Sequence, residues 1–417
     1  MEPLRVLIIG VGSRGTTYAR YIQKHPEDAV VVGVAEPGEF RRNRIAEMFD
    51  IPDENLWDDW SGAASGPRTA DAVIIATPDA LHTEPAIAMA GKGYHILLEK
   101  PMSPCEADCR RIIQSVEDRG DIHFAVCHVM RYTCYTQVLK GIIDSGRIGR
   151  VVNVQHLEPV GYWHQAHSFV RGNWRKEDES SFMLLAKSCH DVDWLGYMVG
   201  KPCRRISSFG SLLHFRRDNQ PEGAADRCVD CGVEANCPYS ARKIYMGMLQ
   251  AGRTDWPLDV LAGEVNVETI TEAIRTGPYG RCVYACDNDV VDHQVVNMEF
   301  DGGATASFTM TAFNLAGGRK TRIHGMHGEI YGDGRMITVT DFLSDQSETI
   351  DTSASEATIS GGHGGGDDGI MAAFLGAVAC DDPSRILSGP IQTLETHLAV
   401  FAAERARRNG TVETVSI

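Results

Sequence analysis

The sequence lacks any hydrophobic run longer than a β-strand. A membrane-spanning helix needs about 20 apolar residues, so we expect none in this chain. The first residues also lack a basic segment followed by a long apolar stretch. We therefore expect no secretory signal and a cytoplasmic location.

Basic residues are in deficit as well. The chain has 40 Lys and Arg residues against 56 Asp and Glu residues, which gives a formal net charge of −16. A protein this acidic is a poor partner for nucleic acid or for an anionic membrane surface. At 417 residues, with 43% hydrophobic and 23% charged residues, the chain is long enough to form two globular domains.

The twelve cysteines are mostly scattered, and we interpret them as reduced thiols. The exception is a cluster with the spacing Cys228-x2-Cys231-x5-Cys237, followed by Cys282 and Cys286. A CxxC pair with a third cysteine nearby is typical of a structural zinc site, and either Cys282 or Cys286 could supply the fourth thiolate. We predict zinc bound by Cys228, Cys231, Cys237 and Cys286. Free thiols are the alternative, and the spacing does not match the usual iron–sulfur runs.

What the sequence does contain is a glycine-rich turn directly after its first apolar run. Leu4–Ile9 predicts a buried strand, Gly10-Val11-Gly12-Ser13-Arg14-Gly15 the turn, and Thr16–Gln23 a helix. A second apolar run, Val30–Ala35, ends at Glu36. Strand, GxGxxG, helix and acid in this order form the fingerprint of a dinucleotide-binding site. We predict that the cofactor is bound by Gly10, Gly12, Ser13, Arg14, Gly15 and Glu36.

Glu36 also bears on the choice of cofactor. A carboxylate at this position accepts hydrogen bonds from ribose hydroxyls and repels a 2′-phosphate, which favours NAD. Arg41 and Arg42 follow a few residues later and could instead bind the phosphate of NADP. We interpret both arginines as solvated helix residues and predict NAD, with NADP as the alternative.

The first 125 or so residues alternate between strand and helix patterns. Further buried strands are predicted at Ala72–Thr77, Tyr94–Glu99 and Ile122–Val126, and helices at Glu84–Lys92 and from a capping box at Ser103–Glu106 to about Asp118. This alternation predicts a doubly wound parallel sheet, that is, a Rossmann domain of residues 1–128 in an α/β protein.

The remaining residues, 129–417, show a different pattern. Strands are predicted at Val151–Val160, Gln294–Phe300, Ala304–Thr311 and Arg335–Thr340, with a hairpin turn at Asp301-Gly302-Gly303, and two helices close the chain at Gly369–Ala379 and Gln392–Arg408. We predict a second α/β domain around a large, open, mostly antiparallel sheet. A cysteine-containing insertion occupies about residues 215–290.

Four motifs occur in a familiar order: Gly10-x-Gly12-x-x-Gly15, Ala76-Thr77-Pro78-Asp79-Ala80-Leu81-His82, Glu99-Lys100-Pro101 and Cys189-His190-Asp191-Val192-Asp193. Together they resemble the glucose–fructose oxidoreductase, inositol dehydrogenase and rhizopine-catabolism family (Gfo/Idh/MocA). The resemblance extends from residue 4 to the final helix. It implies a Rossmann domain followed by an α/β domain whose open sheet forms a homodimer or homotetramer interface.

The resemblance also implies roles for individual residues. Thr77, Pro78 and His82 would line the nicotinamide side, and Glu99 and Lys100 would contact ribose and substrate. Lys100 would be the main proton-transfer residue, with His190 facing it, because oxidation of an alcohol needs a base within reach of the hydroxyl. Asp193 would be structural.

The chain departs from the family pattern at one position. Many members carry an aspartate four residues before the histidine, where this chain has Ala186. We hypothesise that Lys187 projects into the pocket and takes over part of this role, and we include it with Lys100 and His190 as a catalytic candidate. The alternative is that Lys187 faces solvent.

Aromatic residues are few, at 7%, yet several precede the histidine motif. Aromatic rings with interleaved hydrogen-bond donors suit the stacking and bonding of sugars, so we predict substrate contacts for His164, Trp174 and Arg175; ordinary core and rim positions are the alternative. The family resemblance adds Arg131 and Asp191 to the predicted substrate contacts.

We therefore predict an NAD(P)-dependent oxidoreductase acting on a secondary hydroxyl of a sugar, polyol or sugar derivative. One alternative is an NAD-dependent glycosidase that oxidises C3 transiently, since some members of the family use the same residues in that way. The other is a non-catalytic NAD-binding sensor, although a sensor has no need of Lys100 and His190.

Overall fold

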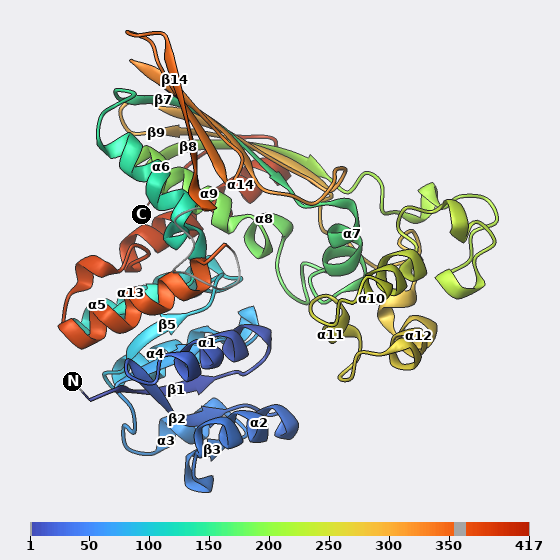
Figure 1. The fold of residues 1–417 in the computed structure, drawn as a ribbon, viewed down its shortest axis with the longest axis horizontal. Helices are drawn as coiled ribbons and strands as arrows, with labels where there is room; N and C mark the ends of the chain where they lie inside the picture. Colours follow the sequence, from blue (N-terminus) through green and yellow to red (C-terminus); the bar gives the residue numbers. More distant parts are fainter. Residues whose placement is uncertain (1, 354–363, 417) are drawn as a thin grey trace.

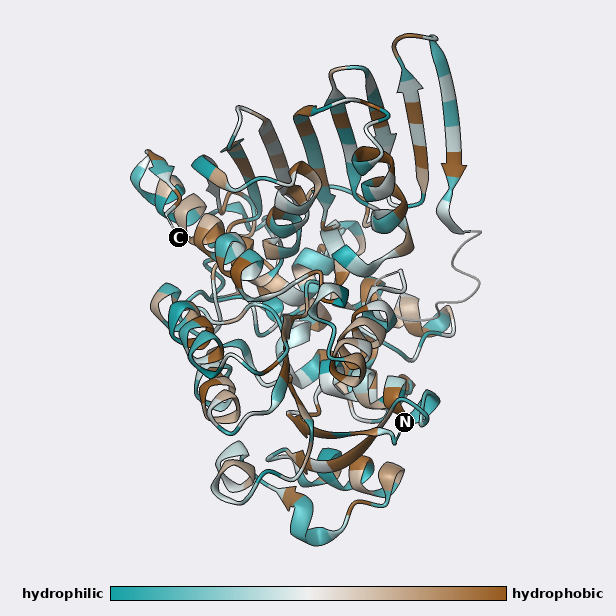
Figure 2. Ribbon diagram, turned by 90° about the vertical axis from the view of Figure 1, so that its left-hand side faces the viewer, coloured by the Kyte–Doolittle hydropathy of each residue, from teal (hydrophilic) through white to brown (hydrophobic). Residues whose placement is uncertain are grey.

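The computed structural model describes residues 2–353 and 364–416. Its first sheet is parallel throughout, with the strand order β3-β2-β1-β4-β5-β6. The strands are β1 (Leu4–Ile9), β2 (Ala29–Ala35), β3 (Leu56–Trp57), β4 (Ala72–Ile75), β5 (His95–Leu98) and β6 (Phe124–Val126). The predicted Rossmann sheet is confirmed. Its strands are short and mostly hydrophobic because helices cover both faces of the sheet (Figure 2).

The helices of this first domain connect the strands. They are α1 (Ser13–Lys24), α2 (Glu39–Phe49), α3 (Trp60–Ser65), α4 (Thr83–Gly91) and α5 (Glu106–Arg119). The predicted capping box at Ser103 is wrong, because α5 begins at Glu106 with Cys105 as its N-cap, and the Ser103 hydroxyl accepts from the Cys105 N–H instead.

Helix α13 (Gly366–Cys380) packs on the Rossmann domain, although it lies near the end of the chain. Its apolar residues Ile370, Met371 and Phe374 join the core around Tyr18 of α1 (Figure 1). The first domain is therefore completed by a segment from the C-terminal part of the sequence. The predicted domain boundary at residues 128/129 marks the first place where the chain passes from the first domain to the second. The chain returns to the first domain at α13.

The second sheet has nine strands in the order β14-β13-β12-β11-β7-β10-β9-β8-β15. Only β7 and β10 pair in parallel among these described strands. The strands are β7 (Val151–Pro159), β8 (Cys203–Ser211), β9 (His293–Phe300), β10 (Thr305–Thr311), β11 (Lys320–Gly325), β12 (Gly328–Gly332), β13 (Met336–Asp341), β14 (Gln346–Asp351) and β15 (Val412–Thr414). The predicted open, mostly antiparallel sheet is confirmed, and Asp301–Gly303 is the turn of the β9–β10 hairpin.

Helices cover one face of this sheet and leave the other open (Figure 1). α6 (Cys134–Asp144), α8 (Met183–Ala186), α9 (Cys189–Val199) and α14 (Pro390–Asn409) lie on the covered side, where α9 packs on β7 and β10 and α14 on β8. Alternate residues of β10 are buried, as a half-covered strand requires.

The cysteine-containing insertion projects to one side of the molecule (Figure 1). It is built from short helices, α10 (Gly247–Gln250), α11 (Leu258–Leu261) and α12 (Val267–Thr276), around a small core of their own. The neighbouring α7 (Tyr162–His164) continues into a π-helical segment, Gln165–Arg171. No helix in the described residues is long and apolar enough to cross a membrane.

Candidate active site

The glycine loop between β1 and α1 has the shape that a dinucleotide needs. Gly10 has a φ of +86°, and a Cβ atom on it would lie 2.7 Å from the Ala76 carbonyl oxygen. A Cβ atom on Gly15 would lie 2.0 Å from the Gly10 carbonyl oxygen, so both positions require glycine. Gly12 caps α1, and a Cβ there would have no described neighbour within 4 Å. The loop therefore leaves room for a pyrophosphate beside Ser13 at the helix N-terminus.

Glu36 closes the same loop. Its carboxylate accepts the Val11 N–H at 2.9 Å and is almost fully buried. The Arg41 guanidinium lies 2.6 Å away and Arg42 donates to the Glu36 carbonyl oxygen, so neither arginine is simply solvated as predicted. Burial alone would raise the pKa of Glu36, but the Val11 and Gly38 N–H groups and Arg41 hold it below its usual range.

A cavity of about 730 Å³ lies between the two domains and opens beside the glycine loop. Of the predicted site residues, it is lined by Arg14, Thr77, Pro78, Glu99, Lys100, Trp174, Lys187 and His190. These residues come from positions 14 to 190 of the chain, and the fold brings them to one surface. Sequence reasoning missed further lining residues, namely Asp79, His156, Asn173, Glu179 and Arg319.

On the Rossmann side, Glu99 is the centre of a buried ionic cluster. Its Oε1 accepts from Arg14 Nε and from the Tyr18 hydroxyl, each at 2.5 Å, and Arg14 also binds Asp367 of α13 at 2.6 Å. Burial alone would raise the pKa of Glu99, but Arg14 and the Tyr18 hydroxyl hold it below its usual range. The cluster fixes the side chain of Arg14 at the point where the glycine loop meets the cavity.

Lys100 and His190 line the cavity from opposite domains. Lys100 follows β5, and its ammonium group donates to the Ala186 carbonyl oxygen at 2.8 Å. His190 lies in the first turn of α9, and its ring packs edge-on against the buried ring of His128. A proton acceptor or donor from each domain is thus available to a ligand bound between them.

Lys187 also lines the cavity, as hypothesised. Its Nζ lies 3.1 Å from the Glu158 carboxylate of β7, which is buried behind it. Arg319 reaches the same carboxylate at 2.9 Å. The sequence offered no signal for this arrangement, because Glu158 and Arg319 lie far from the histidine motif along the chain.

Several predicted contacts lie elsewhere, and these interpretations are corrected by the geometry. The His82 ring is fully buried, and its two nitrogens lie 2.8 Å from the Pro101 carbonyl oxygen and 2.9 Å from the Thr77 carbonyl oxygen. It therefore supports the two loops that carry Thr77 and Lys100 instead of lining the nicotinamide side.

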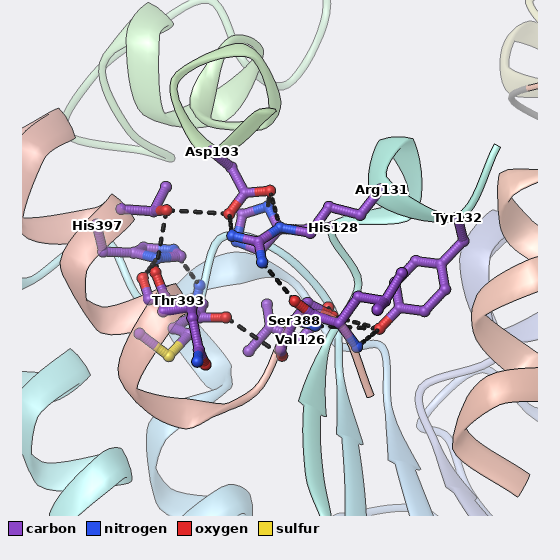
Figure 3. Close-up of polar contacts among 12 residues, drawn as sticks. Val126, His128, Arg131, Tyr132, Asp193, Ser388, Thr393 and His397 are labelled. Carbon is purple, nitrogen blue, oxygen red and sulfur yellow. Dashed lines mark hydrogen bonds and ion pairs between the residues drawn. The ribbon is translucent and has the colours of Figure 1, made fainter. Parts of the chain in front are cut away.

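Arg131 is also placed inside the protein, not at the substrate (Figure 3). Its guanidinium forms two hydrogen bonds of 2.7 Å to the Asp193 carboxylate and a third to the Leu387 carbonyl oxygen. Asp193 additionally accepts from Thr396 of α14 at 2.9 Å. The expectation that Asp193 is structural fits this pairing, which ties α9 to the end of the first domain.

Two further histidines lie in the same network (Figure 3). His397 of α14 accepts the Met102 N–H at 3.0 Å and donates to the Thr393 carbonyl oxygen at 2.8 Å, which fixes its tautomer and holds the loop after Lys100. His128 is fully buried, and neither ring nitrogen has a hydrogen-bond partner in the described part of the chain. Burial lowers the pKa of His128 to about 3 and that of His397 to about 4.

Of the remaining predicted substrate residues, Asp191, His164 and Arg175 lie outside the cavity lining, and Trp174 lies on it. Asp191 is fully buried and binds His156 at 3.1 Å and also Arg319, so it supports the cavity wall from behind. His164 packs among aromatic rings, including Trp256 at 5.0 Å, and Arg175 binds Asp287 on the surface. Within the described lining of the cavity, only Trp174 remains of the predicted aromatic set.

The structure does not support the predicted zinc site. Cys228, Cys231, Cys237 and Cys282 line one small cavity, whereas the Cys286 thiol donates to the Cys282 carbonyl oxygen. Across residues 2–353 and 364–416, the only three potential ligands close enough for one metal ion are His25, Glu27 and Asp28. The Cys228 sulfur accepts hydrogen bonds from Arg171 and from the Ala241 N–H.

A Rossmann domain with an open glycine loop, joined to a second α/β domain across a cavity lined by Lys100 and His190, defines a two-domain dinucleotide-binding oxidoreductase. The chain belongs to the Gfo/Idh/MocA oxidoreductase family. Residues 4–128 match its NAD-binding Rossmann fold and residues 140–365 its C-terminal alpha/beta domain. The predicted family is confirmed.

Named relatives and solved structures agree with this assignment. The chain is 26% identical over 379 residues to the putative oxidoreductase YteT of Bacillus subtilis, covering 85% of this chain and 83% of that protein. It is 30% identical over 210 residues to the 2,7-anhydro-N-acetylneuraminate hydratase of Mediterraneibacter gnavus, covering 50% and 53%. A crystal structure of levoglucosan dehydrogenase with NADH and levoglucosan has the same fold, with a TM-score of 0.71, 20% identity and full coverage of both chains.

Proposed function

We propose that this protein is an NAD-dependent oxidoreductase that moves a hydride between the nicotinamide and a secondary hydroxyl of a sugar, polyol or sugar derivative. The observation that carries the proposal is the meeting of Lys100 and His190 in one cavity that begins at the glycine loop. Relatives named as dehydrogenases of inositol and levoglucosan support the substrate class.

The residues of the chain supply position and proton transfer. The bound cofactor supplies the hydride acceptor. Lys100, held by the Ala186 carbonyl oxygen, would accept the hydroxyl proton in its neutral amine form as the alcohol is oxidised, and His190 would pass the proton on from the other domain. Thr77 and Pro78 would shape the nicotinamide side, and Trp174 would cover a face of the sugar ring.

The environment of Glu36 supports NAD over NADP. Its buried carboxylate lies at the end of β2, where a ribose 2′-hydroxyl would donate to it and a 2′-phosphate would be repelled. Arg41 is already paired with this carboxylate. We expect NADH to bind at least about tenfold more tightly than NADPH, measured by quenching of protein fluorescence.

The test is reduction of NAD⁺ by a panel of sugars and inositols, followed at 340 nm. Lys100→Met should lower kcat by about 100-fold or more and leave the NADH dissociation constant within a factor of three, because Lys100 acts on the proton and not on the nucleotide. Lys24→Met, at an exposed position of α1, is the matched control. A Lys100→Met enzyme that turns over at the rate of the control would overturn the assignment.

A second candidate is a reaction in which the hydride returns to the substrate within each turnover, as in an NAD-dependent glycosidase. The observation that favours it is the relative named as a hydratase, an activity with no net redox change. Purified protein that retains its nucleotide through dialysis, and that cleaves nitrophenyl glycosides without accumulating NADH, would select this reaction over the dehydrogenase.

We also propose that the chain forms a homodimer or homotetramer through the open face of the second sheet. Val152 of β7, Phe209 of β8 and Tyr331 of β12 are exposed at 44%, 66% and 44%. Exposed apolar residues on several strands of this sheet favour burial against a second copy. Light scattering of the purified protein tests this directly, since a monomer at micromolar concentration would contradict it.

A further inference from the structure

The wall that the second domain contributes to the cavity presents cations to a bound ligand. Lys187 follows α8 and Arg319 precedes β11, and both side chains line the cavity while remaining partly exposed, at 21% and 25%. Their counter-charges, Glu158 and Asp191, are only 5% and 0% exposed and lie outside the described lining. A ligand at this wall therefore meets N–H donors and not the carboxylates behind them.

The carboxylates hold the two cations in place. Glu158 binds Lys187 at 3.1 Å and Arg319 at 2.9 Å. The Asp191 carboxylate accepts hydrogen bonds from Nε and Nη2 of Arg319. It is also hydrogen-bonded to the His156 ring at 3.1 Å. In the described structure these contacts leave Arg319 Nη1 and two donors of the lysine ammonium for a ligand. Donors fixed before binding lose little conformational entropy when they are used.

The two cations of the wall and the two carboxylates behind them balance in number, but they differ in position. Lys187 and Arg319 line the cavity, whereas Glu158 and Asp191 are buried behind them, so the positive groups face a ligand. The neighbouring position in the chain, Ala186, adds no charge. A family-type aspartate at position 186 would place a negative charge beside Lys187.

Two of the other acids on the cavity lining are paired with other cations. Glu99 is bound by Arg14, and Glu179 is paired with Arg175 at 2.8 Å. Asp79 lies on the Rossmann side, where burial raises its pKa. Within the described residues none of these three carboxyl groups forms an ion pair with Lys187 or Arg319, so an anionic group on the ligand would face the two cations directly.

We propose that Lys187 and Arg319 form a carboxylate-binding subsite and that the substrate is a polyhydroxy acid, such as a uronate or an aldonate. This inference rests on the proposed oxidoreductase function. The Ala186 carbonyl that holds Lys100 directly precedes Lys187, so the proton-transfer residue and the subsite meet at the same segment of the chain. Trp174 and Asn173 on the same cavity would meet the remaining sugar surface.

The test uses pairs of compounds that differ mainly in the carboxylate. The pairs are glucuronate and glucose, galacturonate and galactose, gluconate and sorbitol, and L-tartrate and L-threitol. Turnover is followed as NADH formation by the NAD⁺-bound protein, and compounds that are not turned over are measured by titration calorimetry of the NADH complex. We expect at least one acid to have a KM or Kd about tenfold or more below that of its neutral partner.

The variants connect this preference to the two side chains. Lys187→Met and Arg319→Met should each remove most of this preference, and Lys187→Arg should keep it. Lys176→Met, at a partly exposed lysine that is paired with Asp178 and lies outside the cavity lining, should leave it unchanged. NADH affinity within a factor of three shows that a variant is folded. The subsite is overturned if no acid binds better than its neutral partner, or if Lys187→Met keeps the preference of the unmodified protein.

The same experiment separates failure of the subsite from failure of the proposed function. Turnover of neutral sugars alone would retain the oxidoreductase and overturn the subsite. Acids that bind without any NADH formation would support the subsite and count against the dehydrogenase. Absence of NADH binding would overturn both.

Discussion

Acidification should destabilise this protein because several histidines are buried in the neutral form, among them His128 and His397. Burial lowers the pKa of His128 to about 3 and that of His397 to about 4, whereas a histidine in the unfolded chain titrates near about 6.5. The unfolded chain therefore binds protons between pH 6.5 and 4 that the folded chain does not. Stability falls as the pH decreases through this window and levels off below the folded pKa values.

The size of the effect follows from the distance of the pH from the unfolded pKa. At pH 5 each histidine should cost about 2 kcal/mol of unfolding free energy relative to pH 7.5, or about 4 kcal/mol for the pair. Urea unfolding followed by circular dichroism at pH 7.5, 6 and 5 measures this loss. His128→Phe isolates one of the two contributions, because the His128 ring nitrogens have no described hydrogen-bond partner to lose.

Between pH 7.5 and pH 5, the unfolding free energy of the His128→Phe variant should fall by about 2 kcal/mol less than that of the unmodified protein. His25→Gln, at a partly exposed histidine of the Rossmann domain, is the control and should keep the original pH dependence. If His128→Phe shows the same loss as the unmodified protein, His128 is not buried in the neutral form and the reasoning fails.

Three further changes follow from single contacts. Gly15→Ala should abolish NADH binding or soluble expression, because the new Cβ would lie 2.0 Å from the Gly10 carbonyl oxygen. Gly12→Ala should still fold, because a Cβ at that position has no described atom within 4 Å. Arg131→Met should lower the unfolding free energy by about 3–5 kcal/mol in urea titrations, since it leaves the buried Asp193 carboxylate without its main partner; a loss below 1 kcal/mol would contradict this. His397→Leu should reduce kcat without changing NADH affinity, because the Met102 N–H in the loop after Lys100 loses its hydrogen-bond acceptor. His397→Gln should restore most of the rate. Equal losses of kcat in both variants would argue against a role of His397 in positioning Lys100.

Much of the candidate site could be predicted because its signals are local. The GxGxxG turn and the acid after β2 are spaced by the geometry of one βαβ unit, and both lie where expected. Lys100 and His190 belong to short motifs at the end of a strand and the start of a helix. The predicted strands of the first sheet were close to their observed bounds because each is a continuous apolar run.

Other predictions failed because burial decides the role of a polar side chain, and burial depends on distant segments. Arg131 resembles a surface cation in the sequence, yet Asp193, 62 residues away, takes it into the interior. His82 lies in a family motif, yet carbonyl groups occupy both of its ring nitrogens. The cysteine spacing indicated a metal, but although four of these cysteines line one cavity, no three of the described thiols lie within 4.8 Å of one another.

The sequence by itself determined the Rossmann domain and the dinucleotide loop, since these depend on periodicity and on residues within one turn or one strand end. Lys100 and His190 became proton-transfer candidates through the resemblance to the Gfo/Idh/MocA family. Only the tertiary structure decided which side chains share the cavity. Glu158 and Arg319 are 161 positions apart yet bind each other across neighbouring strands of the second sheet, and together with Lys187 they give the cavity wall its charge. Ionic contacts of this kind depend on distance in space and on exclusion of water, neither of which is encoded in a local pattern of residues.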